Sequence, residues 1–238
     1  MKKTLLIAAI AAMAAVSCQK ENSEKVLNRT ISVTAETLPM TKVSVKDGVQ
    51  PVWTAGEKAS LISMTDYASK GTYSLQESDI AQDGSRARFS FGAVANGSYR
   101  IISPEPSSVS SEGVVFNIPA AQTQKELGIS GSRACLVGGV KGSSDGVLAD
   151  LVIDSETGEY DAYFRLAGAL LQFNIYDSSN KAAGEKIKSV SISATDANLS
   201  GSMTVSYDGK LKSVSGTGSS VTVTVNNLSF SNAYTQNS

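Results

Sequence analysis

Short stretches in which apolar and polar residues alternate recur through most of this chain, and they limit its fold more than any other feature. The first begins at Thr30 and places Ile31, Val33 and Ala35 on one side, with serine and threonine on the other. A period of two residues sends successive side chains to opposite faces of a β-strand. Because clusters of Gly, Asn, Pro and Ser separate these stretches, we predict an all-β chain built from sandwiched sheets.

The same alternation predicts strands at short intervals as far as residue 225. They cover residues 30–37, 41–45, 58–65, 71–75, 87–91, 98–103, 113–118, 133–140, 147–153, 160–176, 187–194, 201–207, 210–214 and 221–225. Residues 120–128 have weak helical character instead, and the register of 187–194 slips near Lys188-Ser189. Asp208-Gly209 is a dipeptide typical of two-residue type I′ turns, so we expect a hairpin around it.

Trp53 is the only tryptophan of the chain and begins the run Trp53-Thr54-Ala55-Gly56-Glu57. Gly56 can take the positive φ that a tight turn requires, and the next strand is predicted directly after Glu57. A large aromatic side chain beside such a corner usually packs into the core. We therefore expect Trp53 to anchor the core rather than to form a platform for a ligand.

The first 21 residues have the features of an export signal. Lys2 and Lys3 supply positive charge, residues 5–16 form an apolar run, and small residues precede Cys18. The run is shorter than the roughly 20 residues that a membrane-spanning helix needs. Small residues directly before a cysteine predict a lipoprotein signal peptide at residues 1–17. Acylation of Cys18 with fatty acids such as palmitate would then tether the chain to a membrane. The alternative is that Cys18 is incidental and a soluble exported protein is released nearby.

Residues 18–29 are polar and without periodicity, which predicts a short lipidated tether.

Composition excludes several classes of partner. Loss of residues 1–17 removes two lysines and lowers the formal charge from −1 to −3. Such a surface has no basic field to attract nucleic acid. Cys135 is the only cysteine besides Cys18, so there is no disulfide framework, and its apolar neighbours predict a buried, inert thiol.

The absence of histidine from all 238 residues argues against an enzyme. It excludes Ser-His-Asp and Cys-His catalysis and zinc held by histidine. Residues 154–161 carry several carboxylates and a glycine, but their spacing completes no EF-hand loop, so a solvated turn is the simpler interpretation. A glycosidase that uses two carboxylates is an alternative, although no such pair is identifiable from spacing. We expect no catalytic residues, no metal site and no cofactor.

We divide the exported chain into two sandwich domains, residues 30–158 and 159–238. The second is short for a domain. We therefore expect it to be incomplete at its C-terminus, or its last strand to be completed by something else.

Six short elements follow one another along the chain. They are Cys18 with Gln19-Lys20-Glu21-Asn22, the strand at 30–35, the pair Thr41-Lys42, the run 52–61 with Trp53, Gly56 and Glu57, the run 118–122, and the segment 164–173. Together they resemble the fimbrillin-like (Mfa-like) surface lipoproteins of bacteroidete bacteria, with the W-x-x-G-[DE] element the most telling. The resemblance covers most of residues 18–225, and the chain departs from the family in its short second domain.

The resemblance implies two transthyretin-like β-sandwich domains in a lipoprotein on the outer face of the outer membrane. Its function would be that of a pilus (fimbrial) subunit or adhesin, and its partners would be other pilus subunits or a host or bacterial surface. In polymerising members of the family, a protease removes the first strand after a basic residue, and a C-terminal strand of a neighbouring subunit fills the groove.

In this chain the removable strand would be residues 30–37, and Lys42 stands where the basic residue would follow it. Arginine is the more usual residue there in the family. Arg29 precedes the strand, so a cut at Arg29 would release the anchor and leave the groove filled. Loss of an edge strand would expose unpaired backbone groups, which an incoming strand satisfies.

The alternative function is that of a glycan-binding surface lipoprotein in a nutrient-uptake system. Such a protein uses exposed aromatic side chains to stack on sugars, and Tyr67 and Tyr73 are the candidates here. Aromatic residues make up 6% of the chain, and its one tryptophan is expected to be buried.

Overall fold

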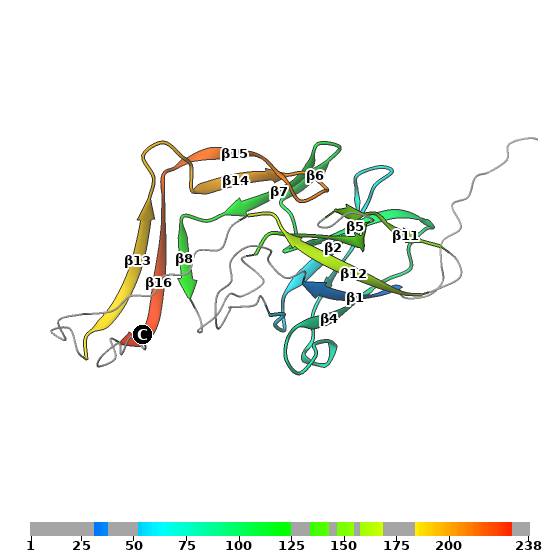
Figure 1. The fold of residues 1–238 in the computed structure, drawn as a ribbon, viewed down its shortest axis with the longest axis horizontal. Helices are drawn as coiled ribbons and strands as arrows, with labels where there is room; N and C mark the ends of the chain where they lie inside the picture. Colours follow the sequence, from blue (N-terminus) through cyan, green and yellow to red (C-terminus); the bar gives the residue numbers. More distant parts are fainter. Residues whose placement is uncertain are drawn as a thin grey trace, which may run out of the picture.

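The computed structural model describes residues 31–37, 52–124, 134–142, 147–154, 158–168 and 184–229. Within these ranges the chain consists of β-strands, turns and one short 3-10 helix, η1 (Glu77–Asp79), as Figure 1 shows. The predicted all-β class is confirmed.

Most of the strands overlap the predicted intervals, but the strand at 108–110 was not predicted, and the single strand predicted at 147–153 is divided into two. The strands are β1 (Ile31–Thr37), β2 (Lys58–Ser63), β3 (Ser69–Ser74), β4 (Arg86–Phe91), β5 (Gly97–Ser103), β6 (Ser108–Ser110), β7 (Gly113–Ile118), β8 (Ala121–Gln124), β9 (Leu136–Lys141), β10 (Leu148–Ala149), β11 (Leu151–Ile153), β12 (Glu159–Leu166), β13 (Lys186–Ser193), β14 (Ser200–Val205), β15 (Leu211–Gly218) and β16 (Ser220–Ser229). The predicted strand at 41–45 and residues 169–183 lie outside the described residues.

In the part of the chain that the structure describes, the largest sheet has nine strands, seven of them in the order β3-β2-β5-β9-β12-β1-β4. In addition, β10 pairs with β9 and β11 pairs with β5. Within this sheet the β1–β12 pair is parallel and the other pairs are antiparallel. The two outer strands approach each other, because the rings of Tyr73 on β3 and Phe89 on β4 lie 6.4 Å apart, edge to face. The sheet therefore curls around a core.

Two cores lie on opposite faces of β2, β5 and β9. Leu61 and Ile101 belong to the first core, which is enclosed by the curled sheet, whereas their neighbours Ile62 and Ile102 belong to the second. Burial on both faces explains why β2 is buried at every residue after Lys58. A strand with one solvated face would alternate instead.

A four-stranded sheet in the order β15-β14-β7-β6 carries much of the second core. Phe116 on β7 and Met203 on β14 are opposite each other in the antiparallel pair and are both buried. This pairing joins residues 113–118 to residues 200–205. In addition, β12 lies in the large sheet between β9 and β1. The predicted domain boundary at 158/159 therefore does not coincide with a division between sheets.

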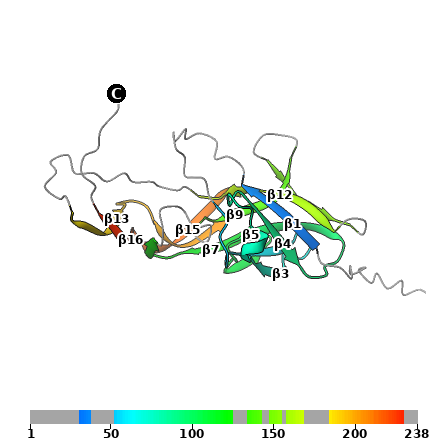
Figure 2. The same cartoon turned by 90° about the horizontal axis from the view of Figure 1, so that it is seen from below.

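The third sheet contains, among the described residues, three strands in the order β13-β16-β8. Figures 1 and 2 both show β13 and β16 standing to one side of the other sheets. Where side chains are described in this sheet, none is buried. The predicted register slip is confirmed, since the β13–β16 pairing shifts between Ile187 and Ser189. The weak helix predicted at 120–128 is wrong at its start, because Ala121–Gln124 is strand β8 and pairs in parallel with β16.

The hairpin predicted around Asp208-Gly209 joins β14 to β15, but the turn type differs. The amide of Gly209 donates to the Ser206 carbonyl, and Gly209 has a φ of 79°. The central residues of the turn are thus Tyr207 and Asp208, and Gly209 is its last residue. The predicted turn would have had Asp208 and Gly209 at its centre. Three-residue loops of this kind usually carry a bulge, and the β14–β15 register does shift between Thr204 and Val205.

Among the described residues, no helix is long and apolar enough to cross a membrane.

Candidate functional site

Three of the predicted site residues, Cys18, Arg29 and Lys42, lie outside the described residues. The strand that Arg29 and Lys42 bracket is β1, which is described. The candidate site is therefore the place of β1 in the large sheet, which we call the β1 groove: the space between β12 and β4 that β1 fills.

β1 lies inside the sheet rather than at its edge. It pairs in parallel with β12 from Ser32 opposite Glu159 to Thr37 opposite Phe164. Its other side pairs antiparallel with β4, from Ile31 opposite Phe91. The expectation of a removable edge strand is thus wrong in this respect. Loss of β1 would leave two facing rows of unpaired backbone groups.

One face of β1 carries Ile31, Val33 and Ala35, which are each 0% exposed. Val33 is opposite Phe89 on β4, and all three side chains belong to the first core. Burial of an Ile or Val side chain contributes roughly 1.5–3 kcal/mol. The groove is therefore apolar on its inner face, and β1 contributes substantially to the stability of the sheet.

Trp53 packs beneath this groove. Its ring makes edge-to-face contacts with Phe89 of β4 and with Phe164 of β12, with 5.2 Å between ring centroids in each case. The Trp53 side chain is buried, as expected for a core anchor, and its Nε1 has no hydrogen-bond partner among the described residues. One indole ring thus supports both walls of the groove.

The turn after Trp53 is held by its own side chains. Gly56 has a φ of 90°, as the predicted turn requires. The Thr54 hydroxyl donates to Glu57 Oε1 over 2.7 Å, and the Glu57 amide donates to the Thr54 carbonyl over 3.2 Å. Amide-to-carbonyl bonds of 2.8 Å from Gly56 to Leu75 and from Leu75 to Glu57 fix the turn to the end of β3. The W-x-x-G-E element is thus a structural corner that positions Trp53.

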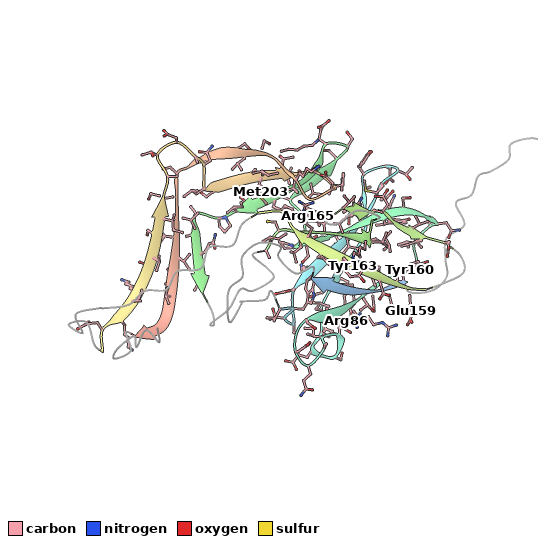
Figure 3. The ribbon with its side chains drawn as sticks, viewed as in Figure 1. Arg86, Glu159, Tyr160, Tyr163, Arg165 and Met203 are labelled. Atoms are coloured by element: carbon pink, nitrogen blue, oxygen red, sulfur yellow. The ribbon has the colours of Figure 1, made fainter. Side chains whose placement is uncertain are left out.

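An ion pair spans the groove on its outer face. Arg88 on β4 donates to Glu159 on β12, so the contact crosses above β1. Figure 3 shows Glu159, Tyr160, Tyr163 and Arg165 following one another along β12. The side chains of Arg88 and Glu159 are both exposed. Exposed ion pairs contribute at most about 1 kcal/mol, so the groove is held chiefly by its inner face.

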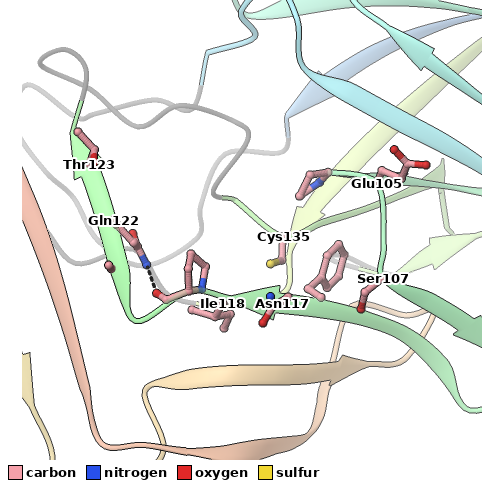
Figure 4. Close-up of a pocket in the computed structure, with 11 residues that line it drawn as sticks. Glu105, Ser107, Asn117, Ile118, Gln122, Thr123 and Cys135 are labelled. Carbon is pink, nitrogen blue, oxygen red and sulfur yellow. Dashed lines mark hydrogen bonds between the residues drawn. The ribbon is translucent and has the colours of Figure 1, made fainter.

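A cavity of about 420 Å³ lies where β7 turns into β8 (Figure 4). Cys135 and Phe116 are in its wall, and the Gln122 side chain donates to the Pro119 carbonyl over 3.4 Å. Burial raises the pKa of the Cys135 thiol to about 12. The thiol is therefore protonated near neutral pH and is a poor nucleophile, although Cys135 is half-buried rather than fully buried as predicted.

Sequence reasoning missed an aromatic pair between two turns. Tyr67, in the turn after β2, stacks on Tyr207, in the turn after β14, with 5.8 Å between ring centroids and 27° between ring planes. Tyr67 has a φ of 52°, which is rare for a residue other than glycine. The Tyr207 hydroxyl donates to the Ser110 carbonyl over 2.9 Å, and burial raises its pKa to about 12. No alternation or motif in the sequence links these two turns.

The turn that contains Tyr67 also borders a smaller cavity of about 210 Å³. Its lining includes Asp66, Lys70 and Asn96. A hydrogen bond from Lys70 lowers the pKa of Asp66 to about 2. The carboxylate is thus ionised, and Lys70 at the start of β3 balances its charge.

No group of three or more His, Cys, Asp or Glu residues that could hold a metal ion occurs in the part of the chain that the structure describes. Of the acidic segment 154–161, residues 155–157 lie outside that part. No family model, no curated protein and no solved structure matches this chain.

Proposed function

We propose that this chain is a lipid-anchored surface protein of the outer membrane that acts as a pilus (fimbrial) subunit or adhesin and is assembled by strand exchange. The lipid on Cys18 would hold it to the membrane, and its partners would be other subunits or a host or bacterial surface. The observation that carries the proposal is the position of β1: a strand inside the large sheet whose Ile31, Val33 and Ala35 are fully buried, and which is bracketed by the basic residues Arg29 and Lys42.

Release of β1 would create a site of defined chemistry. The facing edges of β12 and β4 would each present backbone donors and acceptors along the register that β1 now fills. Phe89, Phe91 and Phe164 would lose their cover on one side, since they share a core with β1. An extended strand from another chain would satisfy both the backbone groups and the apolar surface.

The site of cleavage decides between two outcomes. A cut after Lys42 separates both the lipid on Cys18 and β1 from the rest of the chain. A cut after Arg29 removes the lipid and leaves β1 covalently joined to the sheet. The first outcome supports polymerisation, and the second supports a released monomer with a filled groove.

The proposal is tested with the exported chain and a trypsin-like protease. We expect cleavage after Lys42, identified by N-terminal sequencing, followed by oligomers in light scattering. A Lys42→Gln variant should resist this cleavage and stay monomeric, whereas Arg29→Gln should still assemble. A protein that stays monomeric after verified cleavage at Lys42 would contradict assembly by strand exchange.

Tyr67 favours a second candidate function, that of a glycan-binding surface lipoprotein. Its ring is half-buried and stacked on Tyr207 at a strained backbone position, and strained residues gather at binding sites. Glycan-array binding that is lost in Tyr67→Ala would support this function. Tyr73 is a poorer probe, because its ring packs on Phe89 and its hydroxyl donates to Asp79, so Tyr73→Ala would disturb the core.

A further inference from the structure

The sequence of β1 has a close counterpart at β13. Residues 29–37 are Arg-Thr-Ile-Ser-Val-Thr-Ala-Glu-Thr, and residues 188–196 are Lys-Ser-Val-Ser-Ile-Ser-Ala-Thr-Asp. In both stretches a basic residue is followed by two β-branched aliphatic residues and an alanine, which alternate with serine or threonine. No other stretch of the 238-residue sequence has this alternation.

The β1 groove selects for the alanine of this pattern. Ala35 is opposite Ala87 on β4 and Ala162 on β12, and all three are at most 2% exposed. A larger side chain at this position would need space that a close-packed interior does not have. A strand that enters the groove in the register of β1 must therefore carry a small residue there, and β13 is followed by Ala194 at the corresponding position.

The two β-branched aliphatic residues of each stretch also have the same total side-chain volume. Val190 corresponds to Ile31 and is one methylene smaller, whereas Ile192 corresponds to Val33 and is one methylene larger. Cores tolerate hydrophobic exchanges best when total volume and pattern are kept. The outward residues Ser191 and Ser193 correspond to Ser32 and Thr34, so the polar face is kept as well.

β13 is also poorly held where it lies. It is the outer strand of the three-stranded sheet and pairs only with β16 among the described strands. Figure 2 shows the pair standing clear of the large sheet. Val190 and Ile192 are only half-buried there, whereas Ile31 and Val33 are fully buried in the groove. Transfer of β13 into a vacant groove would exchange partial burial for complete burial.

We infer that β13 of one copy of this chain can occupy the groove that β1 leaves in another copy, parallel to β12 and antiparallel to β4. Val190, Ile192 and Ala194 then take the places of Ile31, Val33 and Ala35. This inference rests on the proposed exchange of β1, and it names an internal strand of the same chain as the donor.

The test uses the full chain with residues 38–43 replaced by the recognition sequence of a site-specific protease, so that β1 is cut from the sheet without other cleavage. The cut protein is mixed with synthetic peptides, and native mass spectrometry follows loss of the β1 fragment and binding of the peptide. The peptides are residues 29–37, residues 188–196, and residues 188–196 with Ala194→Leu or with the outward substitution Ser193→Ala.

We expect the 188–196 peptide to displace the β1 fragment within about tenfold of the concentration that the 29–37 peptide needs. The Ser193→Ala peptide should behave like its parent, and the Ala194→Leu peptide should be at least tenfold weaker. If the 29–37 peptide binds and the 188–196 peptide does not, the inference about β13 is overturned while strand exchange stands. If neither peptide binds the cut chain, strand exchange itself fails. Equal binding of the Ala194→Leu peptide would also overturn the inference, because the groove would then not select its occupant.

Discussion

β1 and β13 have nearly the same pattern of residues and very different surroundings. β1 lies between two strands of the large sheet and buries its Ile, Val and Ala completely. β13 is an outer strand of the small sheet, and its Val and Ile are half-buried. The pattern thus determines that both segments are strands and which face of each is apolar. How deeply that face is buried depends on the neighbouring strands, which come from distant parts of the chain.

The largest effect is expected at Trp53, which supports both walls of the β1 groove. Trp53→Ala removes the ring that contacts Phe89 and Phe164, and loss of a buried aromatic side chain lowers the free energy of unfolding by roughly 3–5 kcal/mol. Chemical denaturation followed by circular dichroism measures the change. A loss below about 1 kcal/mol would mean that the groove does not depend on its corner.

A direct comparison of the two strands uses matched positions. Ile31→Ala should lower the free energy of unfolding by about 3 kcal/mol, because the side chain is fully buried. Val190→Ala should lower it by about 1 kcal/mol or less, because Val190 is half-buried and its surroundings can relax. Equal losses in the same denaturation experiment would show that the small sheet is as firmly packed as the large one.

Replacing the matched alanines by a larger residue distinguishes β1 from β13 with a smaller effect on the free energy of unfolding. Ala35→Leu adds side-chain volume between Ala87 and Ala162 and should cost about 2 kcal/mol. Ala194→Leu should change the free energy of unfolding by less than about 0.5 kcal/mol, as is usual away from the core. Thermal unfolding by calorimetry measures both variants, and a destabilised Ala194→Leu protein would contradict the loose packing of β13.

A further prediction is a pH dependence at Cys135, which is half-buried just before β9 and packs against the second core. The pKa of Cys135 is raised from 9.0 to about 12 by burial, so its contribution to stability is complete below pH 9 and is lost as the pH rises towards 12. In a Cys18→Ser chain, the rate of Cys135 labelling by a thiol reagent at pH 8 should rise in Ile31→Ala, which loosens the large sheet. Val190→Ala should leave that rate unchanged.

Much of the fold follows from the sequence because the alternation of apolar and polar residues within a short stretch predicts a strand. The alternation at 30–37 and 187–194 predicts β1 and β13, and even the slip near Lys188-Ser189 appears in the pairing. The corner of Trp53 and Gly56 is likewise local, since a single glycine and a short turn define it. Each of these features depends on residues close together in the chain.

The remainder depends on pairings between distant residues, which alternation does not encode. Nothing local indicates that β1 pairs in parallel with β12, or that β8 pairs in parallel with β16. The stacking of Tyr67 on Tyr207 joins two turns that are about as far apart along the chain as β1 and β12. For the candidate site, the sequence indicated the strand and its apolar face, but its inner position in the sheet followed only from the pairing.

The inner position of β1 also determines how the protein would respond to mechanical force. The ladder hydrogen bonds from β1 to β4 are perpendicular to the strand, and those to the parallel strand β12 are slanted across it. The chain enters β1 from its N-terminal end. A pull through that end, resisted by the large sheet, would act along β1 and load both ladders in shear at the same time. β13 has one ladder among the described strands, and a sideways pull would break the hydrogen bonds of such an outer strand one at a time. A chain held through its N-terminus would therefore transmit tension to the strand best placed to withstand it.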